Sequence, residues 1–472
     1  MYIDVLLQIN AFDDKTFTYS VPSNLVEEVE IGKRVLVPFG KRKLKGIILK
    51  IKKRLDISYN IKDIISIIDE ESLYNNEMIT LGKYMSETYL SPLMSCYQAM
   101  IPSALKFNKK EIKIKYIKYI IKIKNYIPTL KSEINILNLF NKEKEVKKSN
   151  ISNKKSLNNL IDLGILKEIN KEEYRINKET KKQELNILTN KQKETYNYIL
   201  NSNENVCLLR GITGSGKTEI YMHLIKDQLE NNKTAIVLVP EISLTTQLIE
   251  RFRNIFGNDI AVLHSSLSDG ERYDEWRKIK RNEVKIVIGT RSAIFAPISN
   301  LGLIIIDEEQ EDSYKQENVP RYKTIDIALK RSEYNNSKIL LGSATPSLES
   351  YARSKVGLYD LVELTERINK KNLPKVLIID MKDEIKKGNP ILSKKAEELI
   401  YDRLNKREQI MILINRRGYS NYIICNECGN VIKCPNCDIS LTYHKSTNTL
   451  NCHYCNHSEN KPNICPNCGS KH

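Results

Sequence analysis

Long apolar runs are absent from the sequence, and their absence excludes two classes of protein. No stretch approaches the roughly 18–20 apolar residues that a membrane-spanning helix requires, so a membrane protein is not expected. Residues 1–10 contain Asp4 and lack a basic segment followed by an apolar one, so they do not form a secretory signal. The sequence therefore predicts a cytosolic, cytoplasmic protein.

Cysteine is scarce outside the C-terminal region. Of the 10 cysteines, Cys96 and Cys207 stand alone, and the other eight lie between Cys425 and Cys468. In a reducing compartment such a cluster indicates metal ligation rather than disulfide bonds.

Length, hydrophobic content and charge limit the remaining classes. At about 150 residues per domain, 472 residues indicate about three domains or more. A hydrophobic content of 41%, arranged in short apolar runs, excludes a disordered chain. Lys and Arg number 75 against 58 Asp and Glu, and the resulting charge of +17 favours a polyanion such as nucleic acid. Lys, Asn and Ile are abundant throughout, so a coding bias explains the charge equally well.

The first 177 residues predict two modules. Apolar runs at 35–40 and 46–49 around a glycine turn predict a β-hairpin, and residues 78–97 predict a helix. From 107 to 125 Ile alternates with Lys, which is typical of a half-exposed strand whose Lys face meets solvent or phosphate. Two short helices and a strand follow and favour a winged helix, with predicted ranges 132–140, 156–163 and 165–169.

After a polar connector at 178–185, short apolar strands alternate with helices. Nearly continuous β-branched runs are typical of strands that are buried on both faces of a parallel sheet. The predicted strands are 206–209, 235–239, 284–288, 303–306 and 339–341. The chain therefore contains a parallel α/β domain.

A phosphate-binding loop follows the first of these strands. Its residues fit G-x-x-x-x-G-K-[ST] and precede a helix at 219–229, which is the context that the motif requires. The loop N–H groups bind phosphate oxygens, Lys217 reaches the β- and γ-phosphates, and the Thr218 hydroxyl ligates Mg²⁺. The predicted ATP-binding residues are Gly211, Ile212, Thr213, Gly214, Ser215, Gly216, Lys217 and Thr218.

An acidic pair ends the strand at 303–306. Asp307 is expected to hold Mg²⁺ through water, and Glu308 is expected to polarise the attacking water. Acidic residues often end strands as solvated caps, but this pair follows four apolar residues and a phosphate loop. Together the two motifs predict hydrolysis of a nucleoside triphosphate.

Four C-x-x-C pairs occupy the C-terminal region. Each pair presents two thiolates, so eight thiolates are enough for two tetrahedral Zn²⁺ sites. Fe–S clusters are the main alternative, and the spacing alone does not fix which pairs share an ion. Because the region has little apolar content, metal must hold it together. The predicted ligands are Cys425, Cys428, Cys434, Cys437, Cys452, Cys455, Cys465 and Cys468.

The order of these motifs resembles a superfamily 2 helicase, and the finer match is to the PriA family of replication-restart helicases (primosomal protein N′). The segments that carry the resemblance are 211–219, 239–245, 289–295, 314–322, 342–350 and 415–419. The resemblance implies that Gln192 reads an adenine edge and that Ser343 and Thr345 couple the nucleotide to DNA-gripping loops. Gln310 stands where the family typically has His, so the nucleotide bridge is expected to persist without a group that titrates near neutral pH.

The same resemblance implies two DNA contacts. An aromatic-rich loop, Tyr314 to Tyr322 with Arg321, would sense single-stranded DNA, and the neighbouring motif contributes Arg291. An N-terminal pocket would hold the 3′ end of a nascent strand, where Thr18 replaces a frequent Asp. The implied pocket residues are Phe17, Thr18, Gly40 and Lys62.

The resemblance also implies the zinc pairing and the domain plan. The outer pairs (Cys425, Cys428, Cys465 and Cys468) would share one Zn²⁺ and the inner pairs (Cys434, Cys437, Cys452 and Cys455) the other. The fold is multidomain α/β with a RecA-like lobe. The expected parts are a β-rich 3′-end-binding domain at 1–105, a winged helix at 106–177, helicase lobe 1 at 178–368, the beginning of lobe 2 at 369–424, and the zinc ribbons at 425–472.

By resemblance we expect an ATP- and Mg²⁺-dependent 3′→5′ DNA helicase that recognises abandoned forks in a bacterial cytoplasm, near the nucleoid. Its partners would be forked and single-stranded DNA and primosome proteins, including the replicative helicase loader. The late string Q-x-x-G-R-x-x-G-R is absent, so we expect a C-terminally incomplete member that unwinds poorly. The alternatives are a zinc-stabilised fork-binding platform without motor activity and a branch-migrating translocase.

Overall fold

The computed structural model divides into two compact units, Met1–Asn372 and Leu373–His472, which are described separately. The described residues are 1–9, 15–54, 61–107, 112–128, 130–141, 143–176, 183–240, 244, 246–368, 375–388, 391–413, 423–425, 427–435, 439–444, 447–452 and 457–471. Within these ranges no helix is long and apolar enough to cross a membrane.

An antiparallel sheet forms the N-terminal part of the first unit. Its order is β2-β1-β4-β3-β5, and the predicted hairpin is confirmed as β3 paired with β4 around Gly40, whose φ is 57°. Alternate side chains such as Val5 and Val37 fill one buried face. The strands are β1 (Tyr2–Leu7), β2 (Thr16–Ser20), β3 (Arg34–Phe39), β4 (Arg42–Lys52) and β5 (Ser66–Ile67), with a 3₁₀ turn η1 at Ser23–Glu28.

The predicted helix at 78–97 is two helices, α1 (Asn76–Tyr89) and α2 (Leu93–Met100), followed by a 3₁₀ turn η2 at Ser103–Leu105. The side chain of Asn75 caps α1 by accepting a hydrogen bond from the Met78 N–H. Leu90 ends the helix in a left-handed conformation with φ 47°, and Pro92 prevents continuation because it lacks an N–H.

The strands and the two helices predicted between 107 and 169 are present, with a further short strand between the helices, and the winged-helix assignment stays a prediction. The sheet order is β7-β6-β8, and the pairing is antiparallel. Ile120, Val146 and Leu166 form its buried face against the two helices. The elements are β6 (Tyr116–Lys122), α3 (Lys131–Leu139), β7 (Glu145–Lys147), η3 (Lys148–Asn150), α4 (Lys154–Asp162) and β8 (Leu166–Glu172).

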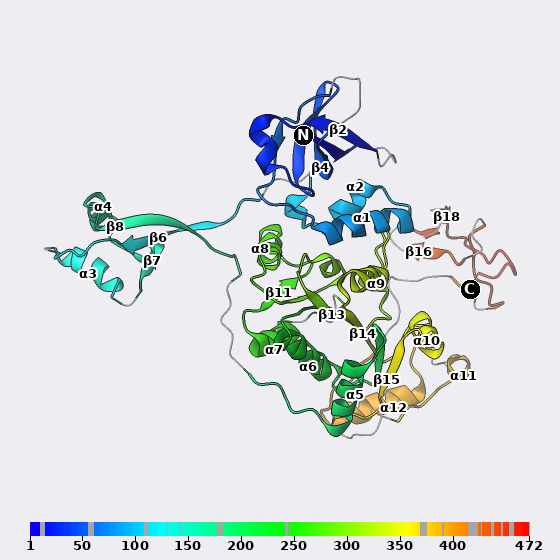
Figure 1. The fold of residues 1–472 in the computed structure, drawn as a ribbon. Coiled ribbons are helices and arrows are strands. Elements are labelled where there is room, and N and C mark those ends of the chain that lie inside the picture. The colour runs from blue at the N-terminus through cyan, green and yellow to red at the C-terminus, as the bar shows by residue number, and fades with distance from the viewer. Residues whose placement is uncertain are drawn as a thin grey trace. The chain divides into compact units, whose positions relative to one another are not determined.

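A seven-stranded parallel sheet of the RecA-like type forms the centre of the first unit (Figure 1), in the order β11-β12-β10-β13-β14-β9-β15. The strands are β9 (Val206–Gly211), β10 (Thr234–Leu238), β11 (Ile260–Leu263), β12 (Ile286–Gly289), β13 (Leu301–Asp307), β14 (Lys338–Ser343) and β15 (Asp360–Leu364). The five predicted strands are confirmed, and the two that the sequence did not indicate, β11 and β15, are the edges.

Helices cover both faces of this sheet, because its side chains point alternately into two apolar clusters. On one face lie α5 (Asn190–Asn201), α6 (Lys217–Glu230) and α7 (Thr246–Phe256). On the other lie α8 (Asp269–Lys280) and α9 (Thr324–Asn335), and α1 and α2 belong to the same cluster. The N-terminal helices therefore share a core with the parallel sheet.

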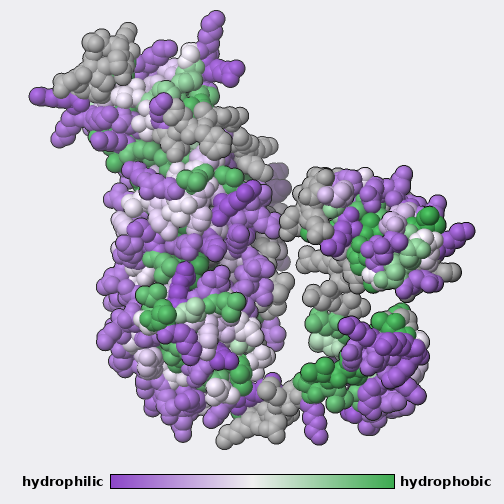
Figure 2. Space-filling view, turned by 90° about the vertical axis from the view of Figure 1, so that its right-hand side faces the viewer, coloured by the Kyte–Doolittle hydropathy of each residue, from purple (hydrophilic) through white to green (hydrophobic). Residues whose placement is uncertain are grey.

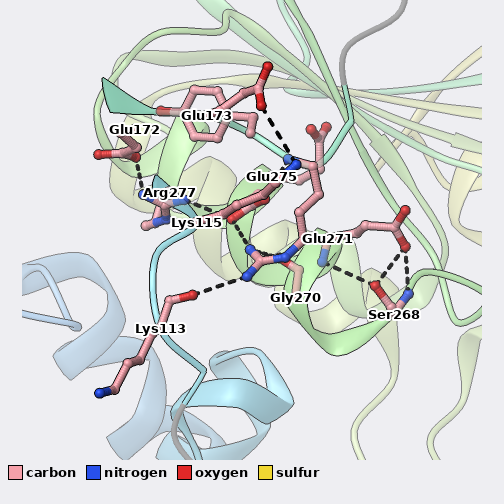
Figure 3. Close-up of polar contacts among 12 residues, drawn as sticks. Lys113, Lys115, Glu172, Glu173, Ser268, Gly270, Glu271, Glu275 and Arg277 are labelled. Atoms are coloured by element: carbon pink, nitrogen blue, oxygen red, sulfur yellow. Dashed lines mark hydrogen bonds and ion pairs between the residues drawn. The ribbon is translucent and has the colours of Figure 1, made fainter. Parts of the chain in front are cut away.

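A polar cluster fixes the end of β8 to α8 (Figure 3). The Arg175 guanidinium lies 2.7 Å from the fully buried Asp274 carboxylate and also donates to the carbonyl of Lys113. Gly270 makes this approach possible, because a Cβ there would lie 2.7 Å from the Arg175 Nε. Arg277 pairs with both Asp274 and Glu172.

The described residues of the second unit form two helices and a small sheet. They are α11 (Met381–Lys386), α12 (Lys394–Asn405) and the antiparallel strands β16 (Thr442–His444), β17 (Thr449–Asn451) and β18 (Ser458–Asn460). The apolar segments 376–378 and 411–413 form no strand in the described part of this unit and are exposed. Figure 2 shows one face of the molecule, on which hydrophilic residues predominate between smaller hydrophobic patches.

Candidate active site and metal centre

The phosphate loop connects β9 to α6 at the carboxyl edge of the parallel sheet. Gly214 and Gly216 adopt φ angles of 81° and 82°, which L side chains rarely adopt. Lys217 donates to the carbonyl of Gly211 at 3.0 Å, and Thr218 follows it in the first turn of α6. Thr213 is exposed, and Ile212 accepts a hydrogen bond from the Ser215 N–H.

The loop fits a nucleotide phosphate. Ser215 is 2% exposed, and its hydroxyl is one of the few buried side-chain polar atoms of the described residues that make no hydrogen bond. Such a group costs free energy unless a ligand or water satisfies it. Its position inside a glycine-rich loop at a helix N-terminus matches the place where a phosphate oxygen binds.

Gln192 lies beside this loop and is already engaged. Its side-chain oxygen accepts from the Thr189 N–H in the capping box of α5, and its side-chain nitrogen donates to the Ser215 carbonyl at 3.0 Å. In this arrangement Gln192 holds the phosphate loop. The implied contact with an adenine edge stays a prediction.

The acidic residues lie opposite the loop, at the end of β13. Asp307 accepts a hydrogen bond from the buried Tyr221 hydroxyl at 2.8 Å, and burial raises the pKa of its carboxyl. Glu308 has φ 46°, which turns the chain directly after the strand, and its Oε1 lies 3.5 Å from the Lys217 Nζ. Lys217, Asp307 and Glu308 therefore converge at one edge of the sheet, where open α/β sheets bind ligands.

The acidic segment is tied to the segment 343–350 by two contacts. Ser343 donates to the Gln310 side-chain oxygen at 2.6 Å, and Gln310 donates to Glu308 at 3.0 Å. The Thr345 N–H donates to the Ser343 hydroxyl at 2.9 Å. Gln310 thus joins Glu308 to the segment 343–350, and its implied contact with the γ-phosphate stays a prediction.

Glu309 supplies the second contact, which sequence reasoning missed. Its carboxylate accepts from the Ser347 N–H at 2.7 Å and from the Ser350 hydroxyl at 2.8 Å, at the beginning of α10 (Leu348–Lys355). Ser347 caps that helix by accepting a hydrogen bond from the Ser350 N–H. The spacing of Ser347 and Ser350, which is typical of a helix cap, was the signal in the sequence that could have pointed to this segment. Tyr221 was also missed, because a tyrosine within an amphipathic helix usually indicates packing.

The aromatic-rich loop packs into the first unit. Tyr314, at the end of η5 (Asp312–Tyr314), is 7% exposed and donates to the Asp307 carbonyl at 2.6 Å. Tyr322 is buried edge-on against Phe295, which ends η4 (Arg291–Phe295). Arg291 donates to the Ser313 and Lys315 carbonyls, and Arg321 is exposed. Neither tyrosine ring is open for stacking here, so DNA contact by this loop stays a prediction.

The predicted N-terminal pocket residues are partly brought together. Phe17 packs edge-on against Phe39, with ring centroids 5.1 Å apart. Thr18 donates to Asp4 at 2.7 Å, and Lys52 pairs with the same carboxylate. Gly40 and Lys62 are exposed, and nothing lies within 4 Å of a Cβ built at Gly40.

The outer cysteine pairs form one group. The sulfur atoms of Cys425, Cys428, Cys465 and Cys468 all lie within 4.8 Å of one another. The Cys425–Cys468 and Cys428–Cys465 sulfur distances are 3.6 and 3.7 Å. Zinc–sulfur bonds of about 2.3 Å in a tetrahedron place sulfurs about 3.8 Å apart, so the group fits Zn²⁺. Hydrogen bonds from the Asn430 N–H and the Asn467 side chain lower the pKa of Cys428 to about 6, whereas the neighbouring cysteines raise the pKa of Cys468 to about 12, as expected of thiols packed closely enough to share protons.

All four C-x-x-C segments share one backbone feature. The N–H of the first cysteine donates to the carbonyl five residues later in each of the pairs Cys425–Asn430, Cys434–Ile439, Cys452–His457 and Cys465–Ser470. The inner and outer segments therefore share this backbone hydrogen bond. Cys437 and Cys455 lie outside the described residues, as do 241–243 and 415–419, so the second metal site stays a prediction.

Three regions match known families. Residues 4–102 match the 3′DNA-binding domain (3′BD) of PriA, residues 189–354 match the DEAD/DEAH box helicase family, and residues 434–459 match the PriA DNA helicase Cys-rich region (CRR) domain.

Two curated relatives match over essentially the whole length of this chain. The chain is 37% identical to "Replication restart protein PriA" of Bacillus subtilis, covering 100% of this chain and 69% of that protein. The protein of the same name from Chlamydia muridarum is 34% identical, with 99% and 66% covered, so the chain spans about two thirds of these relatives. The Synechocystis protein is 48% identical over 56% of this chain and 33% of its own length. With its 3′DNA-binding, helicase and Cys-rich regions in this order, the chain belongs to the replication restart protein PriA family.

Proposed function

We propose that the protein is an ATP-dependent 3′→5′ DNA helicase of replication restart, which recognises stalled or abandoned forks. The observation that carries the motor part is the convergence of Lys217, Asp307 and Glu308 around a loop with an unsatisfied Ser215 hydroxyl. The family relationship supports the DNA substrate, and the 3′→5′ polarity is part of the proposal.

In the proposed reaction the loop N–H groups and Ser215 bind the phosphates of ATP. Lys217 exchanges its contact with the Gly211 carbonyl for the β- and γ-phosphates. Thr218 and Asp307 would hold Mg²⁺, which neutralises developing charge on the phosphates when bound. Glu308 orients the attacking water and accepts its proton.

Gln310 and Glu309 would carry the state of the nucleotide to the segment 343–350. Both side chains contact that segment directly, at Ser343 and at Ser347. Loss of the γ-phosphate would shift Glu308 and therefore Gln310, which donates to it. The aromatic-rich loop would report DNA to the same place, since Tyr314 bonds the Asp307 carbonyl.

The remaining parts would bind DNA and partners. Residues 1–105 with Phe17 and Lys62 would hold the 3′ end of a nascent strand, and residues 106–177 would grip the fork. The Cys-rich region would hold two Zn²⁺, one on the outer and one on the inner cysteines, and would meet primosome proteins such as the helicase loader. Such a substrate places the protein with the nucleoid in the bacterial cytoplasm.

The test is ATP hydrolysis with and without a fork that carries a nascent 3′ end. The expected result is DNA-stimulated hydrolysis that Lys217→Ala abolishes while fork binding is retained. Fork binding without turnover in the wild type would instead support an assembly platform. Equal stimulation by blunt duplex and fork would contradict 3′-end recognition.

A further inference from the structure

We propose that Tyr221 positions Asp307 for the magnesium-bound nucleotide; the inference rests on the proposed ATP site. Tyr221 lies on α6 and is 1% exposed. Its hydroxyl donates to the Asp307 Oδ1 at 2.8 Å. The protein therefore fixes Oδ1 of this carboxylate, at the edge of the sheet where Lys217 and Glu308 also lie.

The sequence position of Tyr221 explains why this bond matters for nucleotide binding. Tyr221 follows Lys217 by four residues on α6, so both side chains leave the same face of the helix. Lys217 approaches Glu308, and Tyr221 contacts Asp307. One rigid helix thus sets the distance between the phosphate-binding lysine and the metal-binding carboxylate.

Strand β14 leaves room for the contact between Tyr221 and Asp307, because its residue 342 is a glycine. Gly342 on β14 is the register neighbour of Asp307 on β13. A Cβ at Gly342 would lie 1.8 Å from the Tyr221 hydroxyl oxygen and 3.2 Å from the Asp307 Oδ1. Any side chain at Gly342 would therefore displace the hydroxyl from the carboxylate.

A hydroxyl that only filled space would affect stability alone, whereas a positioning hydroxyl affects the magnesium-dependent part of binding. Hydrogen bonds to charged groups are stronger than neutral ones, and an unfixed carboxylate must be ordered when the metal binds. The expected consequence of losing the hydroxyl is about a tenfold loss of affinity for the magnesium nucleotide.

The experiment measures binding of a fluorescent ATP analogue to the full chain, in Mg²⁺ and in EDTA. Tyr221→Phe keeps the buried ring, and we expect about tenfold weaker binding in Mg²⁺ with unchanged binding in EDTA. Tyr89→Phe is the matched control, because the Tyr89 hydroxyl donates to Asp326 at the same 2.8 Å between α1 and α9. Tyr89→Phe should change the affinity for the analogue neither in Mg²⁺ nor in EDTA.

Gly342→Ala provides a second, independent route to the same loss. We expect the same magnesium-specific weakening, and a smaller additional loss when it is combined with Tyr221→Phe, because the closest clashing atom is then absent. Equal weakening in Mg²⁺ and EDTA, or none, would overturn the role of Tyr221. A wild type that binds no nucleotide under either condition would contradict the proposed function itself.

Discussion

The parallel-sheet lobe and the Cys-rich region hold their functional residues in opposite ways. In the lobe, two apolar clusters bury the strands, and Lys217, Asp307 and Glu308 lie at the edge of this core. In the described Cys-rich region the apolar cluster has four buried members, two of them cysteines. The lobe should therefore tolerate loss of its functional residues, whereas the Cys-rich region should unfold without its own.

Removal of zinc is expected to have the largest effect. Cys465→Ser or a chelator should unfold the Cys-rich region and leave the lobe folded, since a structural Zn²⁺ contributes about 10–16 kcal/mol to the folding of small zinc domains. Elemental analysis should show loss of one of the two proposed zinc equivalents in Cys465→Ser and of both after chelation, and circular dichroism should still show the thermal unfolding transition of the lobe. Cys207 lies on β9, outside the Cys-rich region, so the control variant Cys207→Ser should retain its full zinc content. An unchanged metal content in Cys465→Ser would contradict the outer pairing.

A buried ion pair should show the next largest effect. Arg331 is fully buried and binds Glu77 of α1 at 2.6 Å, together with the Ile294 and Ala296 carbonyls. Arg331→Met leaves the Glu77 charge without this partner, so the free energy of unfolding should fall by about 3–5 kcal/mol. Lys330→Met, which removes a surface pair with Glu333, should cost about 0–1 kcal/mol. If urea unfolding gave the same small loss of unfolding free energy for Arg331→Met as for Lys330→Met, α1 would not be an integral part of the lobe.

Lys217→Ala should separate function from stability in the lobe. ATP hydrolysis should fall by about 10²–10³-fold or more, because one charged phosphate contact is lost. The melting temperature should stay nearly unchanged, because the polar contacts that the described structure gives this side chain, with the Gly211 carbonyl and Glu308, lie at the edge of the sheet. A large drop in melting temperature would break the contrast between the two regions.

Much of the lobe could be predicted from the sequence because buried parallel strands are continuous apolar runs. The two missed strands are the edges: β15 carries the acidic residues Asp360 and Glu363, whereas β11 is as short and as apolar as the predicted β12, so its composition does not explain why it was missed. Phosphate-loop and acidic motifs are local in sequence and were found. Tyr221 and Glu309 were not found, because their partners lie 86 and 38 residues away and only the fold brings them together. The outer cysteine group likewise depends on how the chain returns, so spacing alone left its pairing open.

The smallest expected effect concerns the cluster that joins β8 to α8. Arg175 is 26% exposed, and Asp274 keeps a second partner in Arg277 when Arg175 is removed. Arg175→Ala should therefore lower the free energy of unfolding by only about 1.5 kcal/mol. Adding Arg277→Ala leaves the buried Asp274 without either cation, so the double variant should lose clearly more than the sum of the single losses.

The cluster around Arg175 also tests whether function and stability are separable outside the core of the lobe. The paired strands β6 and β8 could transmit DNA binding to the lobe through Arg175. In that case Arg175→Ala should retain basal ATP hydrolysis, whereas the stimulation of hydrolysis by forked DNA should fall. Lys278→Ala, which removes a pair with Glu275 on the same helix, is the matched control and should leave the stimulation intact. Undiminished stimulation in Arg175→Ala would show that the contact is a local packing feature, because a cluster that transmits DNA binding cannot lose its central cation without weakening the response.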